Sequence, residues 1–433
     1  MLRSRRRNRA HAVVCALTLL AVPATVSARA TASARVTASA RATASARAHQ
    51  PAKPAHRPAK PKPVPPGFVG MVLDGPLYPV TQPPLDMATQ LDSMVATGVE
   101  TIRATFDWAN SQPYQNFSQV PSDDVGKYTD VGGVPTDFTH VDKLVELAAQ
   151  RRLTILPTVL DSPKWDRITD GRSVIDRPRT NAPYARFLKA LVERYGSNGS
   201  FWRLNPGIPK VPIRQWQIWN EPNIRAFWSA QPYAKTYVSL LHAAHSAIKG
   251  ADHRAKVVLA GLPNYSWIAL KRIYAVKGAR SLFDIVAVHP YTKQPRGVIT
   301  ILTRVRQTMT AAGDGRKPMI ADEISWPSSQ GQTPHNTGFD FATTPAGQAR
   351  NIAAMLPMLG SERVKLGLQA FYYYTWIGTE HRNGLAFDFA GLLRLKSGKV
   401  SDKPAFTAFR RAALALERCR QRGTVATRCL KPG

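Results

Sequence analysis

The sequence predicts an α/β fold in which eight parallel strands close into a (β/α)8 barrel over residues 67–418. Apolar runs of strand length recur eight times in this region, and helical patterns follow them. The runs are apolar almost throughout, as is typical of parallel strands that are covered on both faces. An open doubly wound sheet is the structural alternative, but no glycine-rich phosphate loop follows the first run. These observations favour the barrel.

The elements follow in order along the chain. The expected strands are Phe68–Leu73, Val99–Thr105, Leu153–Val159, Ile213–Trp219, Lys256–Ala260, Phe283–Val288, Pro318–Asp322 and Leu368–Thr375. Between the second and third strands, a period of 3.6 residues places Phe138, Val141, Leu144, Val145 and Ala148 on one helix face. After the fourth strand the same period links Tyr233, Tyr237, Leu240, Leu241, Ala244 and Ile248. Ala405–Leu416 is long enough for a last helix.

Residues 1–28 have the pattern of a signal peptide. Five arginines between Arg3 and Arg9 precede an apolar run of eleven residues, Ala12–Val22, and Val26-Ser27-Ala28 offers small residues for cleavage. The run is shorter than the roughly 20 residues of a spanning helix. We therefore expect a secreted or envelope-associated protein, with an uncleaved membrane anchor as the alternative.

Residues 29–66 are expected to form a disordered basic linker. The hexapeptides Thr31–Val36, Thr37–Ala42 and Thr43–Ala48 are near-perfect repeats, and residues 49–66 are rich in Pro, Ala, Lys and His. The linker carries eight Lys or Arg residues and no acid. It would either contact an anionic cell envelope electrostatically or serve only as a solvated spacer.

The net charge of +31 is spread along the chain. Residues 1–66 hold thirteen of the 59 basic residues, and the remaining 46 stand against 28 acids, which leaves +18. That part contains no zinc-finger spacing, ribonucleoprotein signature or basic stripe with interleaved aromatics. We therefore expect no nucleic-acid partner.

Two cysteines, Cys419 and Cys429, remain after the expected signal removal and lie in the C-terminal tail, residues 419–433. In an exported chain such a close pair favours one disulfide, and two free thiols are the alternative.

In a barrel of this kind, chemistry belongs at the C-terminal ends of the strands. The residues at these ends are Asp74, Arg103, Asp161, Asn220-Glu221-Pro222, His289-Pro290-Tyr291, Asp322-Glu323 and Trp376. Glu221 and Glu323 would face each other across the mouth. Cleavage of a glycosidic bond needs such a pair of carboxyl groups, one to protonate the leaving oxygen and one to attack the anomeric carbon. Five tryptophans at or after strand ends (108, 165, 219, 326 and 376) suit pyranose faces, although core packing is preferred for Trp219.

The chain resembles a known group of enzymes through two segments. Gln217-Ile218-Trp219-Asn220-Glu221-Pro222-Asn223 is similar to the strand-four motif of the clan A retaining glycoside hydrolases, and Ile320–Trp326 is similar to their strand-seven nucleophile segment. The resemblance covers about residues 67–400. Family 39 is the best match and family 5 the next.

The resemblance implies a role for each matching residue. Glu221 would be the acid/base, Glu323 the nucleophile and Asn220 a hydrogen-bond donor to the sugar 2-hydroxyl. His289 and Tyr291 match the strand-six His-x-Tyr of the family, Arg103 matches its strand-two arginine and Trp376 its strand-eight tryptophan, the floor beneath the reacting sugar. Asp74 and Asp161 receive no role.

Other interpretations exist for single motifs. Asn-Glu-Pro alone could begin a helix, Arg103 could pair with a structural acid, and His289 could be a core histidine. About 100 residues after Glu221, a second apolar strand also ends in a glutamate. Chance is therefore a poor explanation for the glutamate pair.

We therefore expect a secreted, metal-independent retaining β-glycosidase that needs no cofactor and acts on carbohydrate as a monomer. About 40 residues lead from the eighth strand to the end of the last expected helix at Leu416, too few for the β-sandwich of family 39 xylosidases. A catalytically inactive glycan-binding barrel is the competing hypothesis. A retaining mechanism requires carboxyl groups about 5–5.5 Å apart, against about 6.5–9.5 Å for inversion. It also requires Arg103 and Tyr291 beside Glu323, and we expect the ring of Trp376 to be exposed in the cleft.

Overall fold

The computed structural model describes residues 63–432 apart from residues 78–84, 172, 174, 264, 333–340, 382–384 and 428. The predicted signal peptide and nearly all of the predicted linker lie outside the described residues. Among the described residues, no helix combines the length and the apolar character that crossing a bilayer requires.

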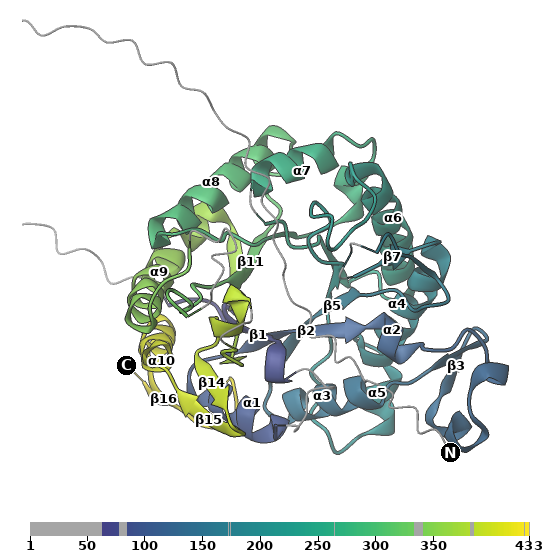
Figure 1. The fold of residues 1–433 in the computed structure, drawn as a ribbon, viewed down its shortest axis with the longest axis horizontal. Coiled ribbons are helices and arrows are strands. Elements are labelled where there is room, and N and C mark those ends of the chain that lie inside the picture. Colours follow the sequence, from purple (N-terminus) through teal and green to yellow (C-terminus); the bar gives the residue numbers. More distant parts are fainter. Residues whose placement is uncertain are drawn as a thin grey trace, which may run out of the picture.

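Eight parallel strands form the centre of the molecule, and helices surround them as a ring (Figure 1). The strands are β1 (Val69–Leu73), β2 (Thr101–Asp107), β5 (Thr154–Leu160), β8 (Gln215–Ile218), β9 (Lys256–Val258), β10 (Val286–Val288), β11 (Met319–Ile324) and β12 (Leu368–Tyr373). Their order runs β10-β11-β12-β1-β2-β5-β8-β9, and bridges from Val258 to Ile285 and from Leu262 to Val288 close the circle. The predicted (β/α)8 barrel is confirmed, because all eight expected strands are present within a few residues of their expected bounds.

The helices cover the outside of the barrel with their apolar faces. They are α1 (Met87–Ala96), α2 (Trp108–Ser111), α3 (Thr139–Gln150), α4 (Asn181–Tyr195), α5 (Ser200–Leu204), α6 (Ala234–Ala251), α7 (Ser266–Tyr274), α8 (Pro295–Ala311), α9 (Pro345–Leu366) and α10 (Pro404–Leu416). In α3 the buried positions are Val141, Val145, Ala148 and Ala149, which follow the predicted period. The helix predicted after strand four is α6, whose Tyr237 donates from its hydroxyl to the carbonyl of Ile218 at 2.9 Å.

Additional short strands lie outside the barrel, in its connecting segments. They are β3 (Thr129–Val131) with β4 (Val134–Thr136), β6 (Arg167–Ile168) with β7 (Arg177–Pro178), and the sheet of β13 (Ile377–Gly378), β14 (Leu393–Lys396) and β15 (Lys399–Asp402). The last sheet belongs to the segment after β12. The buried Lys403 ties this segment together, because its ammonium donates to the carbonyl of Phe389 at 2.8 Å and pairs with Glu380 at 3.1 Å.

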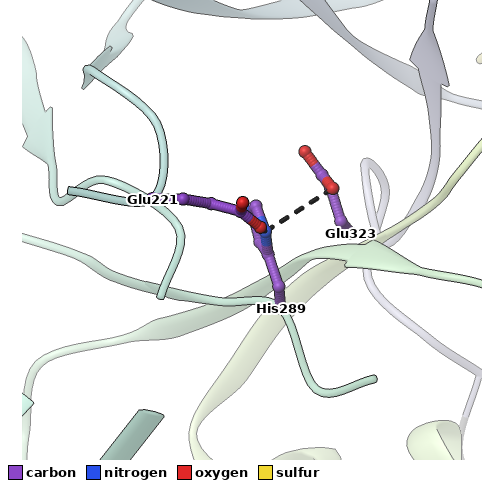
Figure 2. A group of neighbouring side chains, drawn as sticks. All are labelled: Glu221, His289 and Glu323. Carbon is purple, nitrogen blue, oxygen red and sulfur yellow. Dashed lines mark hydrogen bonds and ion pairs between the residues drawn. The ribbon is translucent and has the colours of Figure 1, made fainter. Parts of the chain in front are cut away.

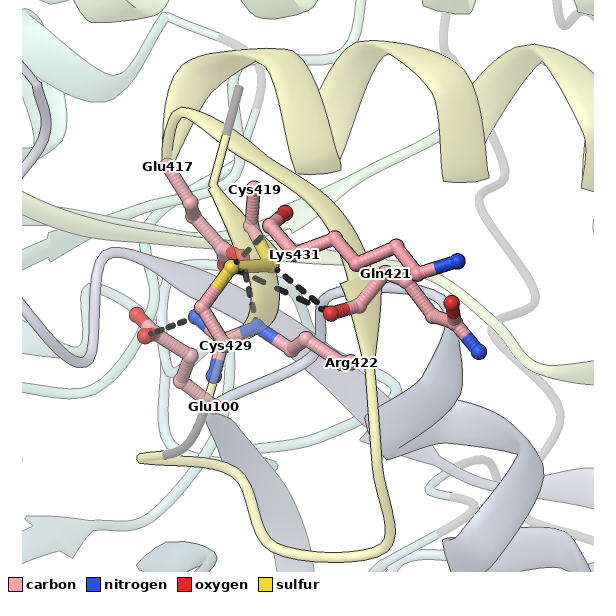
Figure 3. Close-up of a disulfide and its surroundings, with 7 residues drawn as sticks. All are labelled: Glu100, Glu417, Cys419, Gln421, Arg422, Cys429 and Lys431. Atoms are coloured by element: carbon pink, nitrogen blue, oxygen red, sulfur yellow. Dashed lines mark hydrogen bonds and ion pairs between the residues drawn. A yellow bond between two sulfur atoms is a disulfide. The ribbon is translucent and has the colours of Figure 1, made fainter.

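The C-terminal tail forms a hairpin of β16 (Cys419–Arg422) and β17 (Cys429–Pro432), closed by a disulfide between Cys419 and Cys429 (Figure 3). The disulfide favoured by the cysteine spacing is therefore present. The hairpin places the buried guanidinium of Arg422 against Glu100, at 2.6 Å, and against Glu417, at 2.7 Å. Because Glu100 directly precedes β2, this contact ties the tail to the N-terminal end of the barrel strands. Burial and the charge of Glu100 raise the pKa of Glu417 to about 8.

Candidate active site

The two glutamates predicted to act together meet at the C-terminal end of the barrel. Glu221 follows β8, and Glu323 lies on β11. One carboxyl oxygen of Glu221 and one carboxyl oxygen of Glu323 lie within 4.8 Å of each other (Figure 2). This separation falls well below the range of about 6.5–9.5 Å that leaves room for the water of an inverting enzyme. Both side chains are buried, Glu221 completely.

Backbone conformation turns Glu221 toward the barrel axis. The chain takes positive φ at Trp219 (70°) and at Glu221 (43°), immediately after β8 ends. The amide of Glu221 donates to the carbonyl of Gly261 at 3.2 Å. A Cβ on Gly261 would lie 1.9 Å from Nε2 of His289, so only glycine allows this loop to approach so closely. Trp219 packs in the core, as expected, and donates to the carbonyl of Phe227.

A bulge in β11 explains why Asp322 and Glu323 both face the interior. Successive side chains of a regular strand point to opposite faces. Between Ala321 and Ile324, however, β11 has one residue more than its partner β12. Both carboxyl groups therefore reach Arg103, Glu323 at 2.7 Å and Asp322 at 3.4 Å.

Arg103 on β2 forms the centre of a buried polar network. Its guanidinium donates to Gln217 at 2.7 Å, to Glu323 at 2.7 Å and to Oδ1 of Asn220 at 2.8 Å. Burial would lower the pKa of Arg103, but the charges of Glu323 and Asp322 outweigh it and raise that pKa above its usual value. Arg103 therefore remains a cation that holds one oxygen of Glu323 and orients Asn220.

Tyr291, in the loop after β10, holds the second oxygen of Glu323. Its hydroxyl donates to Oε2 of Glu323 at 2.8 Å. Behind it, the ring stacks on Phe341 with centroids 5.1 Å apart and meets Phe387 edge to face. The contacts expected of Arg103 and Tyr291 with Glu323 are thus both present.

His289 connects the two halves of the site. Its Nδ1 lies 2.7 Å from Oε1 of Glu221, and its Nε2 lies 3.2 Å from Oδ2 of Asp322. Burial alone would lower the pKa of His289, but the charges of Glu323 and Asp322 and the hydrogen bonds raise it to about 10. His289 is therefore an imidazolium that donates from both nitrogens, whereas the expectation had left a plain core histidine open.

Glu221 has the environment of an acid. Burial raises its pKa and outweighs the opposing effect of His289, while the charge of Glu323 raises that pKa further. Its Oε2 is buried without a hydrogen-bond partner among the described residues. With Oε1 accepting from His289, Oε2 is the oxygen at which Glu221 can carry a proton.

The three residues Glu221, His289 and Glu323 are also of the types that ligate metals, and one ligand atom of each lies within 4.8 Å of the others. A protonated imidazole has hydrogen on both nitrogens and offers no lone pair. A metal ion at this position would have to displace one of these protons from His289.

A cavity beside Glu323 extends toward strands one, two, three and eight. Its polar lining consists of Asp74, Arg103, Thr105, Asn220, Glu323 and Tyr374. Burial raises the pKa of Asp74 to about 6, although the hydroxyl of Tyr374, at 2.5 Å, and the amide of Gly75 both donate to its carboxylate. The sequence interpretation gave Asp74 no role, yet the structure places it next to the nucleophile candidate. Asp161 does not line this cavity.

The expectation of an exposed Trp376 was wrong. Trp376 is completely buried, donates to Oε1 of Gln90 at 3.0 Å and packs edge to face on Phe406 of α10. The chain leaves β12 at Tyr373, so the strand alternation no longer controls position 376. The aromatic ring that lines the cavity from this segment is Tyr374.

The other tryptophans at strand ends also pack in the protein. Trp108 and Trp326 are buried, and Trp165 is partly buried and donates to the carbonyl of Gln112 at 2.8 Å. Trp108 and Trp326 belong to the hydrophobic core, and Trp165 packs against it.

Gln217 is a site residue that the sequence interpretation quoted without assigning it a role. Its amide bridges the network: Oε1 accepts from Arg103 and from Thr158, and Nε2 donates to Asp322 at 2.6 Å. A glutamine between Trp216 and Ile218 in a barrel strand must find partners inside the protein. This signal was available in the sequence.

The comparisons agree with this geometry at the level of the fold. No family model and no curated protein matches the chain. Among solved structures, the chain is similar to a glucosidase from Croceicoccus marinus, with 16% identity and a TM-score of 0.59 over 82% of this chain and 68% of the glucosidase. It shares the barrel fold of glycoside hydrolases.

Two further structures extend the likeness. A monomeric β-xylosidase from Caulobacter crescentus has 20% identity and a TM-score of 0.56, over 81% of this chain and 69% of the xylosidase. A GH39 enzyme from Xanthomonas axonopodis pv. citri has 18% identity and a TM-score of 0.55, over 80% and 65%. The expected likeness to family 39 barrels is thus confirmed for the fold, and about a third of each of these chains has no counterpart here.

Proposed function

We propose that the chain is a retaining β-glycosidase in which Glu323 is the nucleophile and Glu221 the acid/base. The observation that carries the proposal is the pair of carboxyl oxygens within 4.8 Å, in two different electrostatic environments. Glu323 accepts hydrogen bonds from a guanidinium and a phenol. Burial favours the protonated form of Glu221. Pairs of carboxyl groups in such contrasting environments divide into an acid and a base.

The reaction would proceed by double displacement. Glu323 attacks the anomeric carbon, the bond to the leaving oxygen breaks, and that oxygen takes the proton of Glu221. In the second step the Glu221 carboxylate takes a proton from water, the water oxygen attacks the same carbon, and the ester to Glu323 breaks. Both steps invert the anomeric centre, so the product retains its configuration. Arg103 and Tyr291 serve as positioning residues for Glu323, and Asn220 lines the cavity where the sugar 2-hydroxyl would lie.

The substrate proposed is a β-linked oligo- or polysaccharide. The solved structures similar to this chain include a glucosidase and a β-xylosidase, which makes glucosides and xylosides the first substrates to test. A glycan-binding barrel without activity is the competing function, and the presence of both carboxyl groups in a retaining geometry favours the enzyme.

Substitution with azide rescue tests the two roles. In Glu221→Ala, substrates with good leaving groups should still form the glycosyl-enzyme, and azide should restore turnover and give a β-glycosyl azide. In Glu323→Ala both steps should be lost, and azide should give the α-anomer. The reverse pattern of anomers would exchange the roles, and inactivity of the unaltered protein on all aryl β-glycosides would favour the binding barrel.

We further propose that the protein is secreted and that residues 29–66 attach it to an anionic envelope. The support is their eight basic residues without an acid. Deletion of residues 29–66 should shift the protein from the envelope fraction to the medium and leave activity on a soluble substrate unchanged. Unchanged partitioning after the deletion would reduce the segment to a spacer.

A further inference from the structure

One aromatic side chain is exposed on the catalytic side of the barrel. Six large apolar side chains among the described residues are exposed, and Tyr265, at 65%, is the only aromatic one. Ile268, three positions later in the first turn of α7, is also exposed and extends the apolar surface. Single exposed apolar residues need no explanation, so the argument depends on where Tyr265 lies and how it is held.

Tyr265 lies in the loop that begins beside the acid/base candidate. This loop follows β9, the fifth strand of the barrel, and its Gly261 accepts a hydrogen bond from the amide of Glu221. Tyr265 follows Gly261 by four positions, a span of at most about 14 Å for an extended chain. Tyr265 therefore lies within about 14 Å of Gly261, in the loop between β9 and α7, at the same end of the barrel as Glu221.

The cavity described above lies on the other side. Its lining comes from strands one, two, three and eight and from Asn220 and Glu323, and no residue of strand five or six contributes. In the strand order, β9 is four positions from β1, which is the opposite side of an eight-stranded barrel. An acid must face the leaving-group oxygen that it protonates. The cavity would thus receive the sugar that is attacked, and the leaving-group part of the chain would extend past Glu221 toward Tyr265.

The ring of Tyr265 is held before any ligand arrives. It meets Trp267 edge to face, with centroids 5.4 Å apart and an interplanar angle of 84°. The guanidinium of Arg304 on α8 lies 4.7 Å from the centroid of the Trp267 ring. The carbonyl of Tyr265 accepts hydrogen bonds from the amides of Ile268 and Ala269, which fix its backbone at the start of α7. An ordered ring loses less conformational entropy on binding than a mobile one.

We infer that Tyr265, supported by Trp267, is the stacking surface for a sugar unit in the leaving-group part of a β-linked polysaccharide, beyond the unit next to the cleaved bond. The site would take the apolar C–H face of a pyranose ring, in the same way that aromatic rings pack on apolar surfaces. The inference rests on the proposed function, because the direction of the chain follows from the role of Glu221.

The test compares substrates with and without a leaving-group sugar. β-Xylosyl and β-glucosyl fluorides release only fluoride, whereas β-1,4-linked xylohexaose and cellohexaose extend across the rim. Tyr265→Ala should lower kcat/KM for the hydrolysed hexasaccharide by about three- to tenfold, the size of one aromatic contact, and leave kcat/KM for the fluoride unchanged. Tyr265→Phe keeps the ring and should retain the activity of the unaltered protein on both.

The matched control is Leu204→Ala, which removes an equally exposed apolar side chain, 70% exposed at the end of α5, before β8 and hence on the opposite face of the barrel. An equal loss on fluoride and hexasaccharide in Tyr265→Ala, or no loss on either, would overturn the stacking site while leaving the glycosidase intact. An unaltered protein that hydrolyses neither fluorides nor hexasaccharides would instead contradict the proposed function, and the inference with it.

Discussion

Replacement of His289 by asparagine should move the alkaline limb of the pH profile upward. The imidazolium of His289 donates to Glu221 at 2.7 Å and favours its ionised form, which opposes the effect of burial. Asparagine can keep a donor near this position but removes the charge. The pKa of Glu221 should therefore rise, and the enzyme should keep its acid protonated to higher pH.

The magnitude follows from two bounds. A unit charge about 4 Å away contributes about 4 kcal/mol at an effective dielectric constant near 20, which equals about three pH units at about 1.4 kcal/mol per unit. The neutral amide of asparagine keeps part of this stabilisation of the Glu221 carboxylate, because charged and neutral hydrogen bonds differ by only about 1–1.5 kcal/mol. Both partners are completely buried, so solvent screening does not reduce the effect. We expect a shift of about one to two units.

The assay is kcat/KM against pH on an aryl β-glycoside, whose alkaline limb reports the essential acid of the free enzyme. His242→Asn, an exposed histidine on α6, is the matched control and should leave the profile unchanged. An alkaline limb that stays in place or moves downward in His289→Asn would refute the reasoning, because either result means that no charge on His289 acts on the acid.

Three further predictions concern the network, the tail and the strand-eight tryptophan. Arg103→Met removes the hydrogen bonds to Glu323 and its neighbours. It should destabilise the fold by about 3–5 kcal/mol, measured by urea unfolding, and lower kcat at least about a hundredfold. A near-normal kcat would contradict the role of the network. Replacing Cys419 and Cys429 with serine opens a loop of ten residues. The free energy of unfolding should fall by about 3 kcal/mol, and kcat/KM should not change. Lost activity in the folded variant would count against a purely structural role of the disulfide. Trp376→Ala should lower the free energy of unfolding by about 3–5 kcal/mol and leave kcat/KM of the folded fraction within about twofold. A large rise in KM would instead indicate that Trp376 contacts the reacting sugar.

The eight strands and the glutamate pair could be predicted because both depend on local signals. Apolar runs buried on both faces identify parallel strands wherever they pair, and Asn220-Glu221-Pro222 and Asp322-Glu323 stand at their ends. The mutual position of Glu221 and Glu323 then follows from the barrel, which brings the ends of distant strands together.

Apart from Gln217, the features that were missed depend on details that no local pattern contains. The inward direction of Asp322 beside Glu323 comes from a bulge in β11, and the bulge is a property of the pairing with β12. Trp376 faces α10 because the chain leaves β12 three residues earlier, so its orientation is set by the following loop. Asp74 lines the cavity beside Tyr374, whose hydroxyl donates to it from 300 positions away in the sequence.

The most direct test of the account is to trap the intermediate. A 2-deoxy-2-fluoro-β-glycoside with a good leaving group should inactivate the protein with a single added sugar mass, and peptide mapping should place the sugar on Glu323. The account predicts this ester because Glu323 is the carboxylate held by Arg103 and Tyr291 beside the cavity. Attachment to Glu221 or to any other residue, or hydrolysis that continues without an adduct and gives the inverted anomer, would contradict it.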